Sequence, residues 1–433
     1  MVKRAVKGAG RTIAVPAAIV LLGVVLFGVP GRMAAAATQA TANVPIHGDG
    51  SANLAAADFN GDGRADLAVA DNVKSVSLYI RQPDGTFPEK PTTVLSVTVK
   101  ESAATHQAVA AGDLDGDGKT DLVVANNAAS TLSVFRGHGD GTFDAPSVIE
   151  TLALPNGVAL GDFNSDKRLD LAVVSQGTNK VRILLGTGSG GFQRAADFAV
   201  GAAPASLVVG DFGSSQTAPA RDGKLDLAVS AAADGVIAIL YGLGDGTFSA
   251  PTQYTAPGAT AIVAADLNGD GVADLAVLNP REGTVGVNLG LDRGSMGSFG
   301  GQTVVAELDP AMQLRGLAVA DFDGDGKLDV AVAAEAAPPQ SSGVFVLLNR
   351  PQPRLRLVFF APPVFCLTPG VPTAVLAGNF RDGGAAVDLA VANKESSRVS
   401  VLFGDGKGAF NNCAASQPSG RTEGAHPGGN GGG

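Results

Sequence analysis

The chain has 433 residues, with 41 Asp and Glu against 31 Lys and Arg, and its formal net charge of −10 at pH 7 disfavours nucleic acid and anionic lipid as partners. Trp is absent, and 3 Tyr and 4 His leave few side chains for stacking on a ligand or for imidazole chemistry. The 59 Gly and 24 Pro punctuate runs of Val, Ala and Leu, which is typical of short strands and tight turns.

Residues 1–37 have the organisation of a secretory signal peptide. Basic residues open the chain, residues 13–29 are apolar, and residues 34–37 are four alanines that suit signal peptidase. We therefore expect a secreted or otherwise extracytoplasmic protein, in the periplasm or at the cell surface. The alternative is an uncleaved N-terminal anchor, because an apolar run of about 17 residues is at the lower limit for a membrane span.

A ten-residue motif then organises most of the chain. Its clearest copy is DFNGDGRADL, residues 58–67, with oxygen-bearing side chains at positions 1, 3, 5 and 9. Further copies are DLDGDGKTDL from Asp113, DFNSDKRLDL from Asp162, DLNGDGVADL from Asp266 and DFDGDGKLDV from Asp321, with a stretched copy at residues 211–226 and a degraded one, NFRDGGAAVDL, from Asn379. The seven copies begin 49 to 58 residues apart. Self-similarity at such a period indicates a propeller or another repeat array.

One repeat reads as four short strands. In the second copy these are residues 108–112, 121–125, 131–136 and 146–152, and four antiparallel strands in about 50 residues make one propeller blade. Seven copies predict an all-β, seven-bladed β-propeller over residues 42–413. The last blade lacks an outer strand, which residues 42–47 could supply and so close the ring. Residues 414–433 are rich in Gly, Pro and Ser and are expected to be a disordered tail.

A phenylalanine follows the glycine-rich turn of most repeats. Its regularity predicts packing between blades rather than ligand contact. The residues concerned are Phe87, Phe143, Phe192, Phe248, Phe299 and Phe410.

The acidic motif itself predicts a hard divalent cation. Carboxylates at alternate positions repel one another unless a cation neutralises them, and Ca²⁺ takes six to eight oxygen ligands. An EF-hand is excluded, because position 12 is Val69, Val124, Val277 or Val332 rather than an acid. The alternative for any single copy is a metal-free Asp/Asn-Gly turn.

These stretches resemble FG-GAP/VCBS-type repeats, the blades of the integrin α-chain head propeller and of many secreted bacterial proteins. The resemblance implies Ca²⁺ in the loop between the first and second strands, held by side chains at positions 1, 3, 5 and 9 and the backbone carbonyl at position 7. About five structural sites follow, with weak or no binding in the fourth and seventh loops. The implied ligand sets are Asp58, Asn60, Asp62, Arg64 and Asp66; Asp113, Asp115, Asp117, Lys119 and Asp121; Asp162, Asn164, Asp166, Arg168 and Asp170; Asp266, Asn268, Asp270, Val272 and Asp274; and Asp321, Asp323, Asp325, Lys327 and Asp329.

The two cysteines, Cys366 and Cys413, fall in the last two repeats. A disulfide between them would tie the last blade to its neighbour in an oxidising compartment. The alternative is two independent buried thiols, since the sequence does not fix their separation.

The resemblance favours a non-catalytic adhesion or protein-recognition module that binds an unknown extracellular or envelope protein or glycan. No His, Cys or Ser constellation repeats with catalytic spacing, so we expect no enzyme. A structural envelope component and a calcium-dependent carbohydrate-binding or carbohydrate-active protein are the alternatives. Membrane contact would come only through an uncleaved N-terminal segment. The expected recognition rim lies on the face opposite the acidic loops, at residues 126–127, 176–179, 281–282, 335–342 and 394–395.

Overall fold

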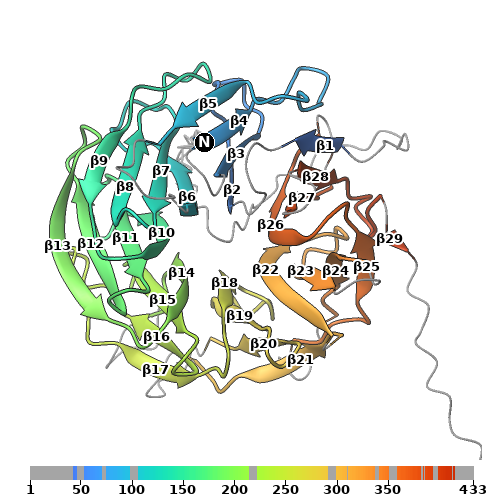
Figure 1. The fold of residues 1–433 in the computed structure, drawn as a ribbon. Coiled ribbons are helices and arrows are strands. Elements are labelled where there is room, and N and C mark those ends of the chain that lie inside the picture. The colour runs from blue at the N-terminus through green and yellow to red at the C-terminus, as the bar shows by residue number, and fades with distance from the viewer. Residues whose placement is uncertain are drawn as a thin grey trace, which may run out of the picture.

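The computed structural model of the chain (Figure 1) describes residues 42–45, 53–70, 75–97, 106–213, 222–290, 299–309, 311–336, 341–350, 358–381, 384, 386–393, 398–411 and 413–414. The expected signal segment and residues 415–433 of the expected tail lie outside this set. No helix in the described ranges is long and apolar enough to cross a membrane.

Seven antiparallel sheets are arranged in a ring, which confirms the predicted seven-bladed propeller (Figure 1). Blades 1 to 4 are formed by β2 (Asn53–Ala57), β3 (Asp66–Ala70), β4 (Ser75–Tyr79) and β5 (Thr93–Ser96); β6 (His106–Gly112), β7 (Asp121–Asn126), β8 (Thr131–Phe135) and β9 (Ser147–Glu150); β10 (Pro155–Gly161), β11 (Asp170–Ser175), β12 (Lys180–Gly186) and β13 (Phe192–Ala199); and β14 (Pro204–Gly210), β15 (Asp226–Ala231), β16 (Val236–Leu240) and β17 (Thr252–Thr255).

Blades 5 to 7 complete the circle. They are formed by β18 (Ala261–Ala265), β19 (Asp274–Asn279), β20 (Thr284–Asn288) and β21 (Thr303–Glu307); β22 (Met312–Ala320), β23 (Asp329–Ala336), β24 (Gly343–Leu347), β25 (Val364–Leu367) and β29 (Cys413–Ala414); and β26 (Pro372–Gly378), β27 (Asp388–Asn393), β28 (Arg398–Leu402) and β1 (Ala42–Pro45). The innermost strands of successive blades are in contact, including β26 with β2 across the point of closure.

The ring is closed by the N-terminal strand, as the sequence predicts. β1 pairs antiparallel with β28, with Ala42 opposite Val401. The acidic loops follow the first strand of each blade, and we call the propeller surface that carries them the loop face. Because β28 runs toward the loop face, antiparallel β1 begins there. By the same reasoning β29, antiparallel to β25, ends at the loop face.

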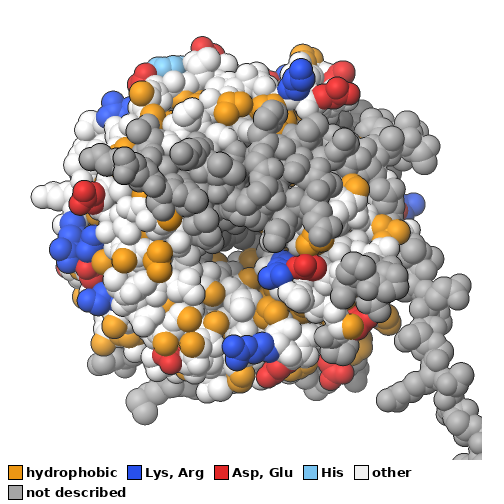
Figure 2. All heavy atoms as spheres, in the orientation of Figure 1, with side chains coloured by type: hydrophobic (Ala, Val, Ile, Leu, Met, Phe, Trp, Pro, Cys, Tyr) orange, Lys and Arg blue, Asp and Glu red, His pale blue; other side chains and the backbone are white. Residues whose placement is uncertain are grey.

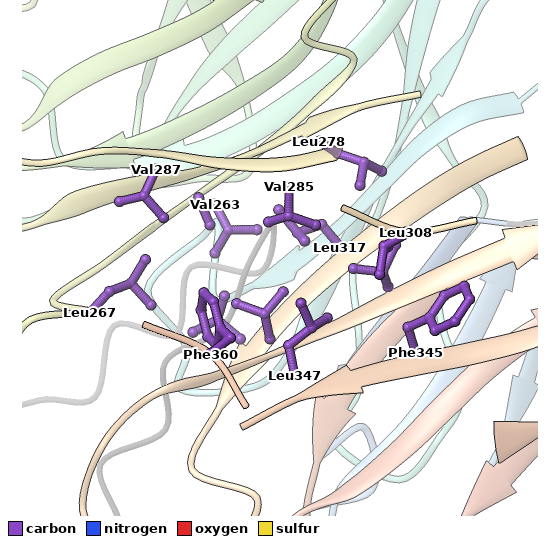
Figure 3. Packing of buried hydrophobic residues seen from close by; sticks show 14 of the residues in the cluster. Val263, Leu267, Leu278, Val285, Val287, Leu308, Leu317, Phe345, Leu347 and Phe360 are labelled. Atoms are coloured by element: carbon purple, nitrogen blue, oxygen red, sulfur yellow. The ribbon is translucent and has the colours of Figure 1, made fainter. Parts of the chain in front are cut away.

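The hydrophobic core lies between blades. Every residue of the second strand is buried in all seven blades, apart from one half-buried position in β23, because both faces of each sheet pack on neighbouring sheets. This explains why these strands read as unbroken apolar runs rather than alternating ones. Figure 3 shows the layer between blades 5 and 6, where Val285 and Val287 of β20 face Leu317 of β22 and Leu347 of β24.

Aromatic pairs mark the blade interfaces, which confirms the predicted role of the repeated phenylalanine. Phe59, at position 2 of the first loop, meets Phe143 of blade 2 edge-to-face with ring centroids 6.0 Å apart. Equivalent pairs join Phe163 with Phe248, Phe212 with Phe299, Phe322 with Phe410, and Phe380 with Phe87 across the closure. Blade 6 uses Phe360, packed in the same cluster as Leu267, which sequence reasoning missed because no glycine-rich turn precedes it.

Backbone hydrogen bonds join three of the acidic loops to the next blade at the same interfaces. The carbonyl oxygen of Phe59 accepts the N–H of Gly141, from the glycine-rich turn of blade 2, at 3.0 Å. Phe163 accepts from Gly246 at 2.9 Å and Phe322 from Gly408 at 3.1 Å. An acidic loop is therefore part of the contact between its own blade and the following one.

Candidate metal centres

The loop that follows β2 is folded around the carboxylate of Asp58. Its Oδ1 accepts the backbone N–H groups of Gly61 at 2.7 Å and Asp62 at 3.2 Å, and its Oδ2 accepts that of Gly63 at 2.7 Å. The first Asp of the other intact copies accepts the same kind of bonds: Asp113, Asp162, Asp266 and Asp321. Position 1 is thus an oxygen donor held in a fixed orientation, as a ligand position requires.

The side chains at positions 3 and 5 turn into the same loop. Asn60 Oδ1 accepts the N–H of Asp62 at 3.2 Å, and Asp62 Oδ1 accepts that of Arg64 at 2.9 Å. Asn164 and Asn268 repeat the position 3 bond. In the two loops with three acids, one oxygen of each side chain lies within 4.8 Å of the other two; these sets are Asp113, Asp115 and Asp117, and Asp321, Asp323 and Asp325. The structure therefore gathers the predicted oxygen donors of positions 1, 3 and 5.

Left-handed backbone conformations allow the loop to double back. Gly61 and Gly63 have φ of +75° and +80°. In the third loop the equivalent residues are Ser165 and Lys167, which adopt φ of +61° and +67°. Lys167 still donates its N–H to Asp162 Oδ2 at 2.8 Å. The third loop keeps the common geometry at the cost of two strained residues.

The aspartate at position 9 closes the loop from inside the blade. Asp66 is fully buried; its Oδ2 accepts the N–H of Phe59 at 2.9 Å and its Oδ1 that of Arg81 at 2.8 Å. The equivalent residues Asp121, Asp170, Asp274 and Asp329 accept matching pairs of bonds. A carboxylate oxygen has a second lone pair, so this structural role is compatible with the predicted ligand role.

The pKa values of these closing aspartates are raised, so their charged forms are disfavoured in the folded protein. Burial raises the pKa of Asp66, Asp121 and Asp170 to about 6 and that of Asp274 and Asp329 to about 7, against the opposing effect of backbone N–H donors. Repulsion from the other carboxylates of the same loop raises the pKa further. A divalent cation within the loop would offset the repulsion and stabilise the buried carboxylate, so the charge pattern fits such an ion.

Position 7 contributes an ion pair that the sequence did not predict. The sequence implies only the backbone carbonyl at position 7 as a common ligand, because the side chain there is Arg, Lys or Val. Arg64 instead pairs with Asp62 at 2.6 Å, and Lys119, Arg168 and Lys327 pair with the position 5 aspartate of their own loops. The pKa of Asp117 is lowered, first by the backbone N–H of Lys119 and then by its side chain. Such solvent-exposed pairs are weak, so a divalent ion can compete with them.

Arg350 is a further residue that sequence reasoning missed. It follows β24, and its guanidinium lies 2.5 Å from Asp323 Oδ2 and 3.3 Å from Asp325 Oδ2 in the sixth loop. It is more than 20 residues from either partner, at a place where blade 6 lacks the usual glycine-rich turn. Only the three-dimensional arrangement brings it to the acids.

The stretched fourth loop keeps much of the scaffold despite its insertion. Gly223 donates to Asp211 Oδ2 at 3.0 Å, Lys224 to Asp222 Oδ1 at 3.0 Å, and Phe212 to Asp226 Oδ2 at 2.6 Å. These are the bonds of positions 6, 7 and 2 in the intact loops. Residues 214–221 fall outside the described ranges, so position 3 is not located.

Cys366 and Cys413 form a disulfide that joins β25 to β29.

The expected recognition rim needs a correction. Asn126 belongs to β7, is buried, and donates to Ser133 Oγ at 2.9 Å, while Glu335 belongs to β23 and pairs with Arg315. Residues 394–395 and 337–340 of the rim lie outside the described part of the chain.

Family comparisons agree with the repeat geometry. FG-GAP-like repeats match residues 58–124, 113–173, 162–214 and 221–277, and an FG-GAP repeat matches residues 315–347. None of the curated proteins matches the chain.

Among solved structures, BBS1N in complex with ARL6DN is similar with 16% identity, a TM-score of 0.51, and coverage of 83% of this chain and 92% of that one. A lectin from Agrocybe aegerita that recognises non-reducing terminal N-acetylglucosamine is similar with 16% identity and a TM-score of 0.49, covering 80% of this chain and 86% of its own. At this identity the first likeness supports the fold alone.

Proposed function

Because the chain is an FG-GAP repeat protein, we propose that it is a secreted or surface-displayed β-propeller, stabilised by calcium, that acts as a non-catalytic adhesion or protein-recognition module. The observation that carries the calcium part is the recurrence of one hydrogen-bonded loop geometry in five loops. In each, positions 1, 3 and 5 point their oxygens into the same turn above a buried aspartate.

Calcium suits this donor set better than other ions. Carboxylates, carboxamides and carbonyls are hard oxygen ligands, and Ca²⁺ tolerates the irregular geometry of a flexible loop. An affinity of about 10⁻⁴–10⁻³ M, as in other extracellular modules, would keep the sites loaded only outside the cytosol. The Cys366–Cys413 disulfide and the signal-like sequence of residues 1–37 support that compartment.

The topology supports recognition by the face opposite the acidic loops. β1 begins and β29 ends at the loop face, so the described part of the chain starts and stops on that face. In a surface-attached protein the opposite face would point away from the attachment. Its turns include residues 176–179 and 281–282 of the predicted rim, where Arg281 and Glu282 are exposed.

A calcium titration followed by a binding experiment tests the proposal. We expect calcium to raise the melting temperature over EGTA, and isothermal titration to give about five sites per chain. An unchanged melt in excess EGTA would reject the calcium part. Capture of an envelope protein on the immobilised propeller, lost on substitution of Arg281 and Glu282, would support recognition. Binding only to a glycan array would favour the carbohydrate-binding alternative.

A further inference from the structure

The seventh acidic loop is built around an arginine instead of an acid. It begins with Asn379, carries Arg381 at position 3, and closes with Asp388. The Arg381 guanidinium lies 2.9 Å from Asp388 Oδ1, and Asp388 is fully buried. The same guanidinium donates to the carbonyl oxygen of Gly404 and lies 5.5 Å from the ring centroid of Phe403.

No other closing aspartate has such a partner in the described residues. Asp66, Asp121, Asp170, Asp226, Asp274 and Asp329 accept backbone N–H groups but form no ion pair. The charges that raise the pKa of these aspartates are carboxylates of their own loops. Around Asp388, by contrast, the charge that acts on the buried carboxylate is the positive charge of Arg381.

A second arginine, Arg81 of blade 1, contacts the seventh loop from the adjoining blade. Arg81 follows β4 of blade 1, is only 3% exposed, and donates from Nη1 to the carbonyl oxygen of Asn379 at 3.2 Å. Five blades have glycine at the position of Arg81: Gly137, Gly186, Gly242, Gly290 and Gly404. The contact between blades 7 and 1 thus has its own polar link.

We propose that Arg381 takes the place of the divalent ion in the seventh loop, so that the blade which closes the ring is held without metal. Blade 7 is completed by β1, a strand from the opposite end of the chain, and no covalent link within the described residues joins β1 to β28. A seam that depended on calcium would open first when calcium fell. A guanidinium carried by the chain supplies a fixed positive charge beside Asp388 at any calcium concentration, and its planar fork suits a carboxylate and a carbonyl together.

Hydrogen exchange with peptide resolution tests this in calcium and in EGTA. The informative amides are Phe380 and Gly404, which both donate to Asp388 at 3.0 Å. In the wild-type protein we expect EGTA to speed their exchange far less than that of the amides of residues 58–66. In Arg381→Met they should exchange on the order of a hundredfold faster in both conditions, because one partner of a buried pair is lost. The control is Arg194→Met, which removes an exposed arginine of β13 that pairs with Asp197 outside the acidic loops and should leave both amides unaffected.

The comparison between calcium and EGTA rests on the proposed calcium binding. The comparison of Arg381→Met with the wild-type protein in one buffer does not. If EGTA exposes Phe380 and Gly404 in the wild type as much as the amides of residues 58–66, a metal holds the seventh loop and the inference is wrong. Equal exchange in Arg381→Met and Arg194→Met would also overturn it. If no loop responds to calcium, the proposed calcium function fails while the role of Arg381 is still decided in EGTA alone. Should Arg381→Met not fold, Arg381→Lys, which keeps the charge, must restore folding.

Discussion

Lys167 gives a quantitative test of the loop geometry, because it holds a left-handed conformation, φ +67°, where the second loop has Gly118 at +83°. A left-handed backbone costs an L-residue about 1–2 kcal/mol. Replacing Lys167 by glycine would relieve this cost, but glycine loses more conformational entropy on folding, which offsets about 0.5–1 kcal/mol of the gain. Lys167→Gly should therefore stabilise the protein by about 0.5–1 kcal/mol.

Denaturant unfolding in EGTA and in calcium measures this difference. Lys167→Ala is the matched control, since it removes the charge but keeps the Cβ atom, and it should give none of the gain. The reverse change, Gly118→Lys, should cost about 1 kcal/mol from the backbone alone, because a Cβ at Gly118 would meet no atom within 4 Å. If Lys167→Gly and Lys167→Ala are equally stable, or if Gly118→Lys is neutral, the left-handed loop is not the geometry in solution.

Three further changes probe the closing aspartates and the ring. The pKa of Asp274 and Asp329 is raised to about 7 from 3.8, so the folded state binds these protons more tightly than the unfolded state. In EGTA the stability that they contribute is greatest below pH 3.8 and falls as the pH rises from there to about 7, whereas saturating calcium should remove the fall; a flat EGTA profile in denaturant titrations would contradict this. Cys413→Ser opens a loop with a sequence separation of 47 and should cost about 4 kcal/mol, an effect that reductant must reproduce in the wild type and not in the variant. Deletion of residues 38–48, which removes β1, should lower the melting temperature sharply, and an unchanged melt would reject closure by that strand.

What the sequence could predict depended on whether the cause was local. Asp58, Asn60 and Asp62 meet within one turn, so spacing alone placed them correctly. The repeat count gave the fold, because each copy marks one blade. Burial of Asp66 by the surrounding blade and the approach of Arg350 to Asp323 depend on neighbours far along the chain, and no local pattern reports them.

Arg381 could be predicted from the sequence only in part. The seventh copy was recognised as degraded from its initial Asn and its extra residue, and weak or absent metal binding was expected there. The replacement of a position 3 ligand by a basic residue was visible in the sequence NFRDGG. What could not be seen is that the side chain reaches the buried Asp388, whereas Arg64 and Arg168 at position 7 pair with the position 5 aspartates of their loops.

The position of the loops has a consequence for how calcium would act on the whole ring. The carbonyl of Phe59 accepts a hydrogen bond from blade 2, and the Phe59 ring packs on Phe143 of the same blade. An ion that fixes the loop from Asp58 to Asp66 therefore fixes the interface with the next blade as well as its own hairpin. Because every blade contacts two others around a closed ring, loosening one interface weakens the support of both neighbours. Loss of calcium should thus lower the stability of the propeller as a unit, with a single unfolding transition that shifts, while the interface of blades 7 and 1, held by Arg381 and Arg81, is the last to lose its hydrogen-exchange protection.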